Sequence, residues 1–212
     1  MSPRPYNLGR RAESIERTRE RILAATRDLL VRDGSRSTSL DEIARAADVA
    51  RATVYYQFGS KVGLLEALVA DIERRAGQAA VLEAVEVEDP GDAVRQAFLA
   101  GCRFWAAEHP LIRTLTGLAA VDGDIERVVA DVQQHRLPLL TGLVERLGDA
   151  GYLSPALPSG RALDILWMLS SFEAFDQLFA GRQLPLDDVA DILADVAIRA
   201  LVARNDAGGA RH

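Results

Sequence analysis

Residues 39–61 read SLDEIARAADVARATVYYQFGSK, a stretch that predicts two short helices joined by a tight turn. Ser39 and Glu42 have the spacing of a capping box, in which the serine hydroxyl and the glutamate carboxylate each accept a backbone amide where a helix begins. A break near Asp48–Ala50 leads to a second helix over Arg51–Phe58. Two helices joined by about three residues have the dimensions of a helix-turn-helix.

The second of these helices presents an outward face that suits a groove of double-stranded DNA. At about 100° per residue, Val54 and Phe58 fall together and point inward. The opposite side and its flank carry small, hydroxyl-bearing, basic and aromatic residues: Arg51, Ala52, Thr53, Tyr55 and Tyr56. The major groove is about 12 Å wide and admits a helix, whose side chains then reach base edges and phosphates. For the two tyrosines, half-buried packing is the alternative.

The same stretch resembles the DNA-binding signature of TetR-family transcriptional regulators. The positions that match this signature in residue type and spacing are Ser39, Ile43, Ala44, Ala47, Val49, Thr53, Val54, Tyr55, Tyr56, Phe58 and Lys61. Residues 21–34, RILAATRDLLVRDG, resemble the family's first helix, so the resemblance covers about residues 15–75. Asp48 replaces a common glycine, and Ala50 replaces a serine cap whose loss costs about 0.5–2 kcal/mol.

The resemblance also implies which residues contact DNA. Phosphate contacts are implied for Ser39, Tyr55 and Lys61, and the groove-facing residues are expected to be Arg51, Ala52, Thr53 and Tyr56. Lys61 is the only lysine in the chain, and it falls at a helix N-terminus, which already favours an anion. An exposed surface charge is the alternative for this lysine. A basic arm with Arg4, Arg10 and Arg11 either adds phosphate or minor-groove contacts or stays a solvated tail.

The remaining sequence predicts an all-α protein of about nine helices, because strand patterns do not stand out and helix formers dominate. The further helices are predicted at Ser14–Arg32, Lys61 to about Glu86, Asp92–Glu108, after Pro110, from Asp122 to about Ala150 with a kink at Pro138, at Arg161–Ala180 and at Pro185–Arg204. The expected organisation is a flexible basic arm (1–13), a helix-turn-helix domain (14–62), a ligand-binding and dimerisation domain (63–204) and a flexible tail (205–212).

Composition and charge narrow the class of protein. The 212 residues are 49% hydrophobic and 26% charged, which excludes a disordered chain, and apolar stretches fall short of the ~18 residues of a membrane span. We expect no signal peptide and, because Cys102 is the single cysteine, a reducing cytoplasmic setting. Residues 1–61 carry 12 Arg and Lys against 8 Asp and Glu, whereas residues 62–212 carry 13 against 23. We therefore expect only the first part to meet a polyanion, with chance variation as the alternative.

TetR-like proteins use their remaining helices for dimerisation and for an inducer pocket. Residues 165–169 are apolar all round, so we expect a homodimer through helices 161–180 and 185–204 that reads a palindromic operator. The candidate ligand-binding residues are Phe98, Cys102, Trp105, His109, Trp167, Phe172 and Phe175, with Glu173 and Asp176 as further polar candidates. Ordinary core packing is the alternative for each. The expected effector is a small, largely apolar molecule.

The expected function is a transcriptional regulator, more specifically a repressor, that its effector releases from DNA. Two other functions remain as alternatives. Asp187, Asp188 and Asp191 form a D-D-x-x-D pattern, which in helical terpenoid synthases helps to hold magnesium-bound diphosphate. These acids also suit a helix start, and no second metal motif or glycine-rich phosphate loop accompanies them. An architectural DNA-binding protein without an effector is the other alternative. We expect no enzyme activity, no catalytic residues, no metal and no cofactor.

Overall fold

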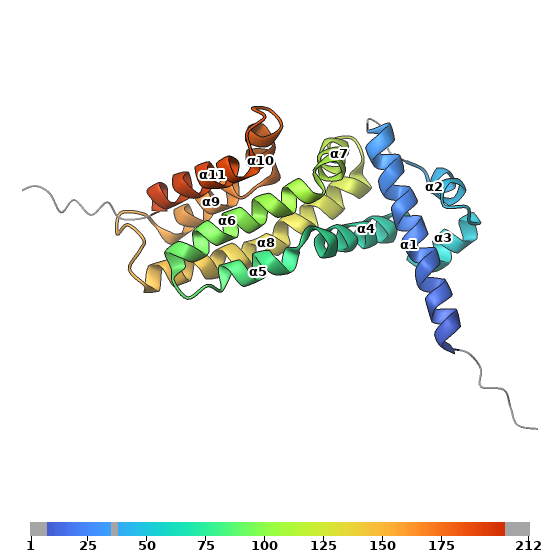
Figure 1. The fold of residues 1–212 in the computed structure, drawn as a ribbon, viewed down its shortest axis with the longest axis horizontal. Coiled ribbons are helices and arrows are strands. Elements are labelled where there is room, and N and C mark those ends of the chain that lie inside the picture. Colours follow the sequence, from blue (N-terminus) through green and yellow to red (C-terminus); the bar gives the residue numbers. More distant parts are fainter. Residues whose placement is uncertain (1–7, 35–37, 202–212) are drawn as a thin grey trace, which may run out of the picture. The chain divides into compact units, whose positions relative to one another are not determined.

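The computed structural model describes residues 8–34 and 38–201, which form eleven helices and no β-strand. Their order is α1 (Leu8–Asp33), α2 (Leu40–Ala46), α3 (Arg51–Phe58), α4 (Lys61–Ala76), α5 (Gln78–Val85), α6 (Pro90–Ala107), α7 (His109–Ala119), α8 (Gly123–Asp149), α9 (Ser159–Leu169), α10 (Phe172–Phe179) and α11 (Leu186–Leu201) (Figure 1). The all-α prediction is confirmed, and the helices outnumber the nine expected.

Two of the predicted long helices are divided in the structure. The helix expected from Lys61 to Glu86 breaks at Gly77, which has a φ of +84° that residues with a side chain rarely adopt. The helix expected over residues 161–180 breaks at Ser171, whose hydroxyl accepts the amide of Ala174 and begins α10. Helix α1 begins at Leu8, inside the stretch expected to be a flexible arm.

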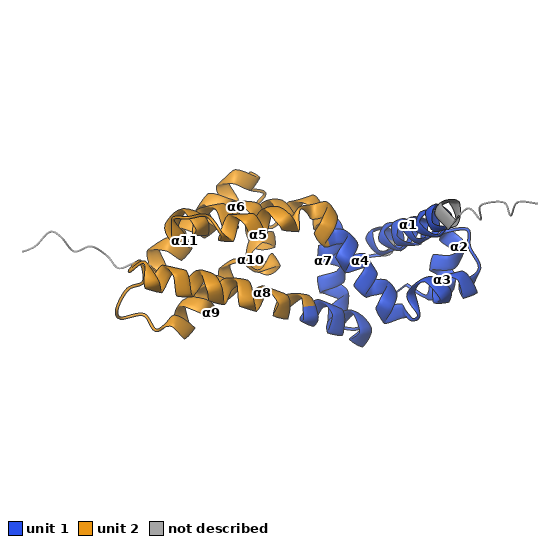
Figure 2. Cartoon of the chain, turned by 90° about the horizontal axis from the view of Figure 1, so that it is seen from below, with its two compact units in different colours: residues 1–72, 110–131 blue, residues 73–109, 132–212 orange. Residues whose placement is uncertain are grey.

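The chain divides into two compact units, shown in Figure 2. Unit 1 contains residues 1–72 and 110–131, and unit 2 contains residues 73–109 and 132–212. Unit 1 therefore holds the helix-turn-helix together with most of α7 and the start of α8, a later segment that the expected boundary at residue 62 assigned to the other domain. Arg4 and the tail from residue 205 lie outside the described residues, and nothing is described of the side chains of Arg10 and Arg11.

The core of unit 1 packs α1 against α2, and α2 against α3. Its deeply buried apolar side chains include Ile22, Leu30, Ile43, Val54, Leu64 and Leu68. Burying each such side chain stabilises the fold by about 1.5–3 kcal/mol. An ion pair of 2.8 Å between Arg27 Nη2 and Asp71 Oδ2, both largely buried, also joins α1 to α4. These contacts leave the outer side of α3 free of the core.

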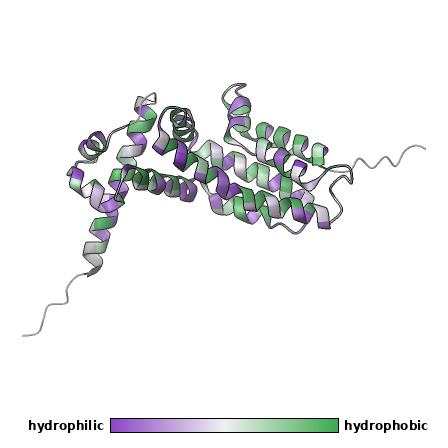
Figure 3. Cartoon of the chain, turned by 180° about the vertical axis from the view of Figure 1, so that it is seen from behind, coloured by the Kyte–Doolittle hydropathy of each residue, from purple (hydrophilic) through white to green (hydrophobic). Residues whose placement is uncertain are grey.

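Unit 2 is built around α6, which packs against both α5 and α11, while α9 and α10 also pack against α11. Its apolar core includes Val94, Phe98, Leu166, Phe175 and Val189. The guanidinium of Arg146 on α8 donates to the carbonyl oxygens of Val85 and Val87, and so closes the end of α5. Figure 3 shows hydrophobic and hydrophilic residues on the ribbons of these helices, as expected where one face is buried. None of the described helices is long and apolar enough to cross a membrane.

Candidate functional site

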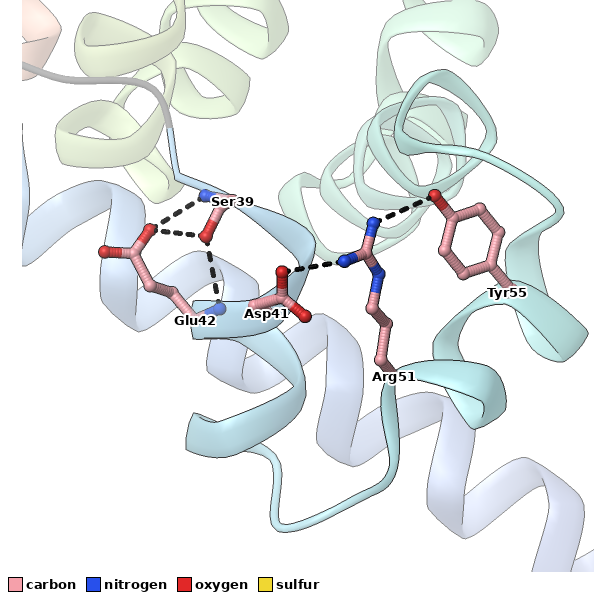
Figure 4. Close-up of polar contacts among 5 residues, drawn as sticks. All are labelled: Ser39, Asp41, Glu42, Arg51 and Tyr55. Atoms are coloured by element: carbon pink, nitrogen blue, oxygen red, sulfur yellow. Dashed lines mark hydrogen bonds and ion pairs between the residues drawn. The ribbon is translucent and has the colours of Figure 1, made fainter.

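The helix-turn-helix begins with the predicted capping box, which the structure confirms (Figure 4). The hydroxyl of Ser39 accepts the amide of Glu42 at 3.3 Å, and the carboxylate of Glu42 accepts the amide of Ser39 at 2.9 Å. The same carboxylate accepts the Ser39 hydroxyl at 2.8 Å. Ser39 therefore lies exposed at the start of α2 with its side chain held in one orientation.

The turn between α2 and α3 depends on Asp48. This residue has a φ of +50°, at the position where the TetR signature commonly has glycine. The amide of Asp48 donates to the carbonyl of Arg45, and the amide of Val49 donates to the carbonyl of Ala44, which together make a Schellman motif. Asp tolerates this backbone better than most residues with a side chain. Ala50 begins α3 without a side-chain cap, as its methyl group requires.

Helix α3 turns Val54 and Phe58 inward and Tyr56 outward, as the helical period of the sequence predicts. Val54 is 1% exposed, and Phe58 is half-buried beneath the guanidinium of Arg19, which lies 4.7 Å from the ring centroid. Tyr56 is 78% exposed and Tyr55 is 43% exposed. Tyr56 is therefore not a packing residue of the described chain. An aromatic side chain this exposed on a short helix is available to a partner.

Arg51 does not project freely from α3. Its Nη1 lies 2.8 Å from Oδ2 of Asp41 on α2, and its Nη2 lies 3.5 Å from the hydroxyl of Tyr55 (Figure 4). The guanidinium also lies 5.5 Å from the centroid of the Tyr55 ring. The hydrogen bond with Tyr55 and the carboxylate of Asp41 raise the pKa of Arg51 above its ordinary value. Asp41, Arg51 and Tyr55 therefore form one exposed polar cluster across the two helices, in which the cation is already oriented.

Lys61 lies at the start of α4 and binds a carboxylate of unit 1. Its Nζ lies 2.7 Å from Oδ2 of Asp122, and the two side chains are 27% and 11% exposed. The other oxygen of Asp122 accepts the amides of Asp124 and Ile125 at 3.0 and 3.3 Å, so Asp122 also begins α8. Lys61 is thus a partly buried, paired residue. Its partner is 61 residues away in the sequence.

Unit 2 contains an apolar cavity of about 130 Å³. Four of the candidate ligand-binding residues line it: Phe98, Cys102, Trp105 and Phe175. Three others, His109, Trp167 and Phe172, are not among the residues that line it. Burial of the Cys102 thiol in the cavity wall raises its pKa to about 12.

His109 has a different environment from the one expected of a ligand-binding residue. Its Nε2 lies 2.6 Å from Oδ1 of Asp176, and its ring packs against the rings of Phe172, Phe175 and Phe179. Asp176 likewise does not line the cavity. His109 and Asp176 therefore pair with each other inside unit 2, which is a packing role that the sequence pattern did not distinguish from ligand binding.

Arg136 on α8 is one of several polar residues of the cavity wall that were not predicted from the sequence. Its guanidinium lies 5.0 Å from the centroid of Trp167 and 6.0 Å from that of Trp105. Burial lowers its pKa to about 10. The sequence around Arg136 does not indicate a binding role, because its helix carries many charged residues. Only the folded chain brings the two tryptophans beside this arginine.

The aspartates of the D-D-x-x-D pattern lie exposed on α11, two of them in its first turn. Across residues 8–34 and 38–201, no group of three or more His, Cys, Asp or Glu residues is arranged to hold a metal ion. Their position at the start of a helix accounts for the pattern through the helix dipole.

Comparisons with known proteins agree on the class of protein. Residues 22–68 match the profile of bacterial regulatory proteins of the tetR family. The chain is 31% identical over 139 residues to an uncharacterized HTH-type transcriptional regulator of Bacillus subtilis, YvkB, and this match covers 64% of the chain and 70% of YvkB. It is also 31% identical over 138 residues to the HTH-type transcriptional regulator AlkX of Mycobacterium tuberculosis, covering 62% of the chain and 61% of AlkX.

Solved structures show the same fold over nearly the whole chain. NalD, described as the secondary repressor of the MexAB-OprM multidrug efflux pump in Pseudomonas aeruginosa, superimposes with a TM-score of 0.73 at 26% identity, over 91% of this chain and 99% of NalD. PfmR of Thermus thermophilus shares the fold with a TM-score of 0.63 at 23% identity, over 86% of this chain and 99% of PfmR. The helix-turn-helix and these matches define a DNA-binding transcriptional regulator. The chain belongs to the TetR family of bacterial regulators.

Proposed function

We propose that this regulator is a repressor that binds a palindromic operator as a homodimer and leaves it when a small, largely apolar effector fills the cavity of unit 2. The observation that carries the DNA-binding part is the outward orientation of Tyr56, which stands 78% exposed on α3. Repression is supported by the 26% identity to NalD, which is itself described as a repressor. A cytoplasmic location follows from this function.

The DNA contacts are proposed for the same seven residues that the signature implies. Ser39, Tyr55 and Lys61 contact phosphates, and Arg51, Ala52, Thr53 and Tyr56 face the groove. Five of these residues are exposed and the other two, Thr53 and Lys61, are partly so. Arg51 is oriented by Asp41 in the structure, so a contact between Arg51 and a base edge in the groove would form beside this ion pair or in its place.

The dimer is proposed to form through the last helices of unit 2. Met168 on α9 is 60% exposed, and Ile192 and Val196 on α11 are also exposed. Helix α9 packs against α11, and large apolar side chains that stand exposed on adjoining helices are typical of a surface that a partner covers. A second copy of the chain is the proposed partner, because a two-fold dimer places two recognition helices about 34 Å apart, one turn of DNA.

Release by an effector requires that the cavity and the DNA-binding helices influence each other. Helix α8 contributes to both units, since its first turn is capped by Asp122 and its later residues Val132, His135 and Arg136 line the cavity. An effector that prefers the conformation incompetent for DNA weakens binding by its differential affinity, typically about 1–3 kcal/mol. The Lys61–Asp122 ion pair gives α8 a direct contact with the start of α4 within unit 1.

The proposal is tested by selection of duplexes from a random pool with the full chain, followed by fluorescence anisotropy on the selected duplex. We expect an enriched palindrome and an affinity that falls as salt rises, because phosphate contacts release counterions. A panel of small apolar ligands should then include one that releases the duplex. A pool that stays random would contradict the proposed function as a regulator. Retention of DNA with every ligand would favour the architectural alternative.

A further inference from the structure

The cavity of unit 2 has one strongly polar end within walls that are otherwise mostly apolar. Its apolar part includes the aromatic side chains of Phe98, Phe104, Trp105 and Phe175. Its polar end consists of Arg136 on α8 with Ser170 and Ser171, the two residues between α9 and α10. Glu73 and Gln78 also line the cavity, from α4 and α5.

The guanidinium of Arg136 has neutral partners and spare donors. Nη1 donates to Oε1 of Gln133 at 2.5 Å, and Nη2 donates to the carbonyl of Trp167 at 3.3 Å and to Oγ of Ser170 at 2.6 Å. A guanidinium has five N–H groups, so two have no protein acceptor among the residues that the structure describes. In the same part of the chain Arg136 forms no ion pair, and Glu173 acts on it only at longer range.

The charge of Arg136 persists although it is largely buried. Burial lowers its pKa to about 10, which leaves the side chain protonated at neutral pH. The faces of Trp105 and Trp167 and the carbonyl end of α9 offset part of this charge. A buried cation that lacks a carboxylate in contact is costly, and a bound anion would remove most of that cost.

The free amides at the start of α10 add a partial positive charge at this end, and the Glu173 carboxylate in the same turn acts against it. Ser171 caps α10, and it also lines the cavity beside Ser170. The N-terminus of a helix carries a partial positive charge from its free amides. Arg136 and the start of α10 therefore act on the same end of the cavity, and both favour a negatively charged group there.

The size and lining of the cavity limit the rest of the ligand. An apolar cavity of about 150 Å³ accepts a benzene molecule, and this one has about 130 Å³. Aromatic walls favour an aromatic ligand through edge and offset ring contacts. We propose that the effector is a small aryl carboxylate, whose ring lies among Phe98, Phe104 and Phe175 and whose carboxylate binds Arg136. This proposal rests on the proposed function only in naming the ligand an effector.

The test compares benzoate with its neutral amide, benzamide, on the full chain. The chain has two tryptophans, and both flank Arg136, so tryptophan fluorescence reports binding at this site. Hydrogen bonds to a charged group are worth about 1.5–3 kcal/mol, so the acid should bind roughly tenfold to a hundredfold more tightly than the amide. Equal affinities, or no binding of either probe at millimolar concentration, would overturn the proposal.

Arg136→Met should abolish the preference for the acid while binding of the amide persists. Arg103→Met is the matched control, because Arg103 lies exposed on α6 and does not line the cavity, and it should keep the preference. Thermal melting establishes that each variant is folded. If Arg136→Met does not fold, the wild-type comparison and Arg136→Lys test the proposal instead. We expect the lysine variant to retain part of the preference for the acid over the amide. A preference that survives in a folded Arg136→Met would contradict the assignment.

The same titrations on protein bound to its selected duplex separate this inference from the proposed function. If the acid binds with the expected preference but does not release the DNA, the anion site is supported and the acid is not an effector. DNA release by the amide as readily as by the acid supports effector control and overturns the anion site.

Discussion

Nζ of Lys61 lies 2.7 Å from Oδ2 of Asp122, so the one lysine of the chain is bound to a carboxylate of the α7–α8 turn. Lys61 is also the residue proposed to contact a DNA phosphate from the start of α4. A phosphate and the Asp122 carboxylate therefore compete for the same ammonium group. On the proposed phosphate contact, the ion pair would make DNA affinity depend on how α8 begins.

Asp122→Asn should strengthen DNA binding by up to about fivefold, because a partly exposed ion pair is worth up to about 1 kcal/mol and its loss removes one anion that competes with a phosphate for the lysine. Asparagine still accepts the amides of Asp124 and Ile125, so the start of α8 is kept. Anisotropy on the selected duplex measures the change. Asp124→Asn removes the same charge two residues away, and an equal gain in that control would show a general charge effect instead.

Lys61→Ala and Arg51→Ala should differ in what they change. Loss of the lysine should weaken all duplexes alike and reduce the slope of log affinity against log salt by about one, as expected for one phosphate contact. Loss of Arg51 should change the sequence that is selected, because this residue is proposed to face the groove. Repeating the selection with both variants gives the answer, and an unaltered consensus for Arg51→Ala would place that side chain on the backbone.

Gly63→Ala should destabilise unit 1 by about 1–3 kcal/mol, the range typical of overpacking. A Cβ at Gly63 would lie 2.2 Å from the carbonyl oxygen of Phe58, so the turn that joins α3 to α4 would have to move. Urea unfolding and DNA affinity should both report the loss. Gly117→Ala is the control in α7, where a Cβ meets nothing within 4 Å, and it should be neutral or stabilising. Equal stabilities for the two variants would mean that the turn yields without strain.

Cys102 should react with a disulfide reagent at pH 8 at least roughly a thousandfold more slowly than the urea-unfolded chain, because only the thiolate attacks. Burial raises the pKa of this thiol to about 12, so the thiolate is scarce in the folded protein. As the pH rises above 9, the reaction rate of the native protein should therefore keep increasing, whereas the rate of the unfolded chain levels off. Reaction at the unfolded rate would show that the cavity wall opens freely.

The helix-turn-helix could be predicted from the sequence because its signals are local. The capping box of Ser39 and Glu42 acts over three residues, and the turn at Asp48 depends on one backbone conformation. The inward position of Val54 follows from the helical period alone. These features need no knowledge of the rest of the chain.

Other features depend on distant parts of the chain and were not predicted. Gly77 breaks a helix, whereas Gly101, Gly117 and Gly142 lie inside helices, and a helical glycine costs only about 1 kcal/mol, so sequence alone does not separate them. The partner of Lys61 is far away in the sequence. The cavity position of Arg136 likewise appears only when α6 and α9 bring their tryptophans to it.

The central claim is that the exposed face of α3 lies on DNA, and photo-cross-linking from position 56 tests it most directly. A benzophenone amino acid replaces Tyr56 in one variant and Met168 in another, since both side chains are largely exposed. We expect position 56 to cross-link to the selected duplex, with loss of the product when unlabelled duplex is added. Position 168 should cross-link to a second copy of the chain. DNA cross-linking from position 56 no stronger than from position 168 would contradict the account.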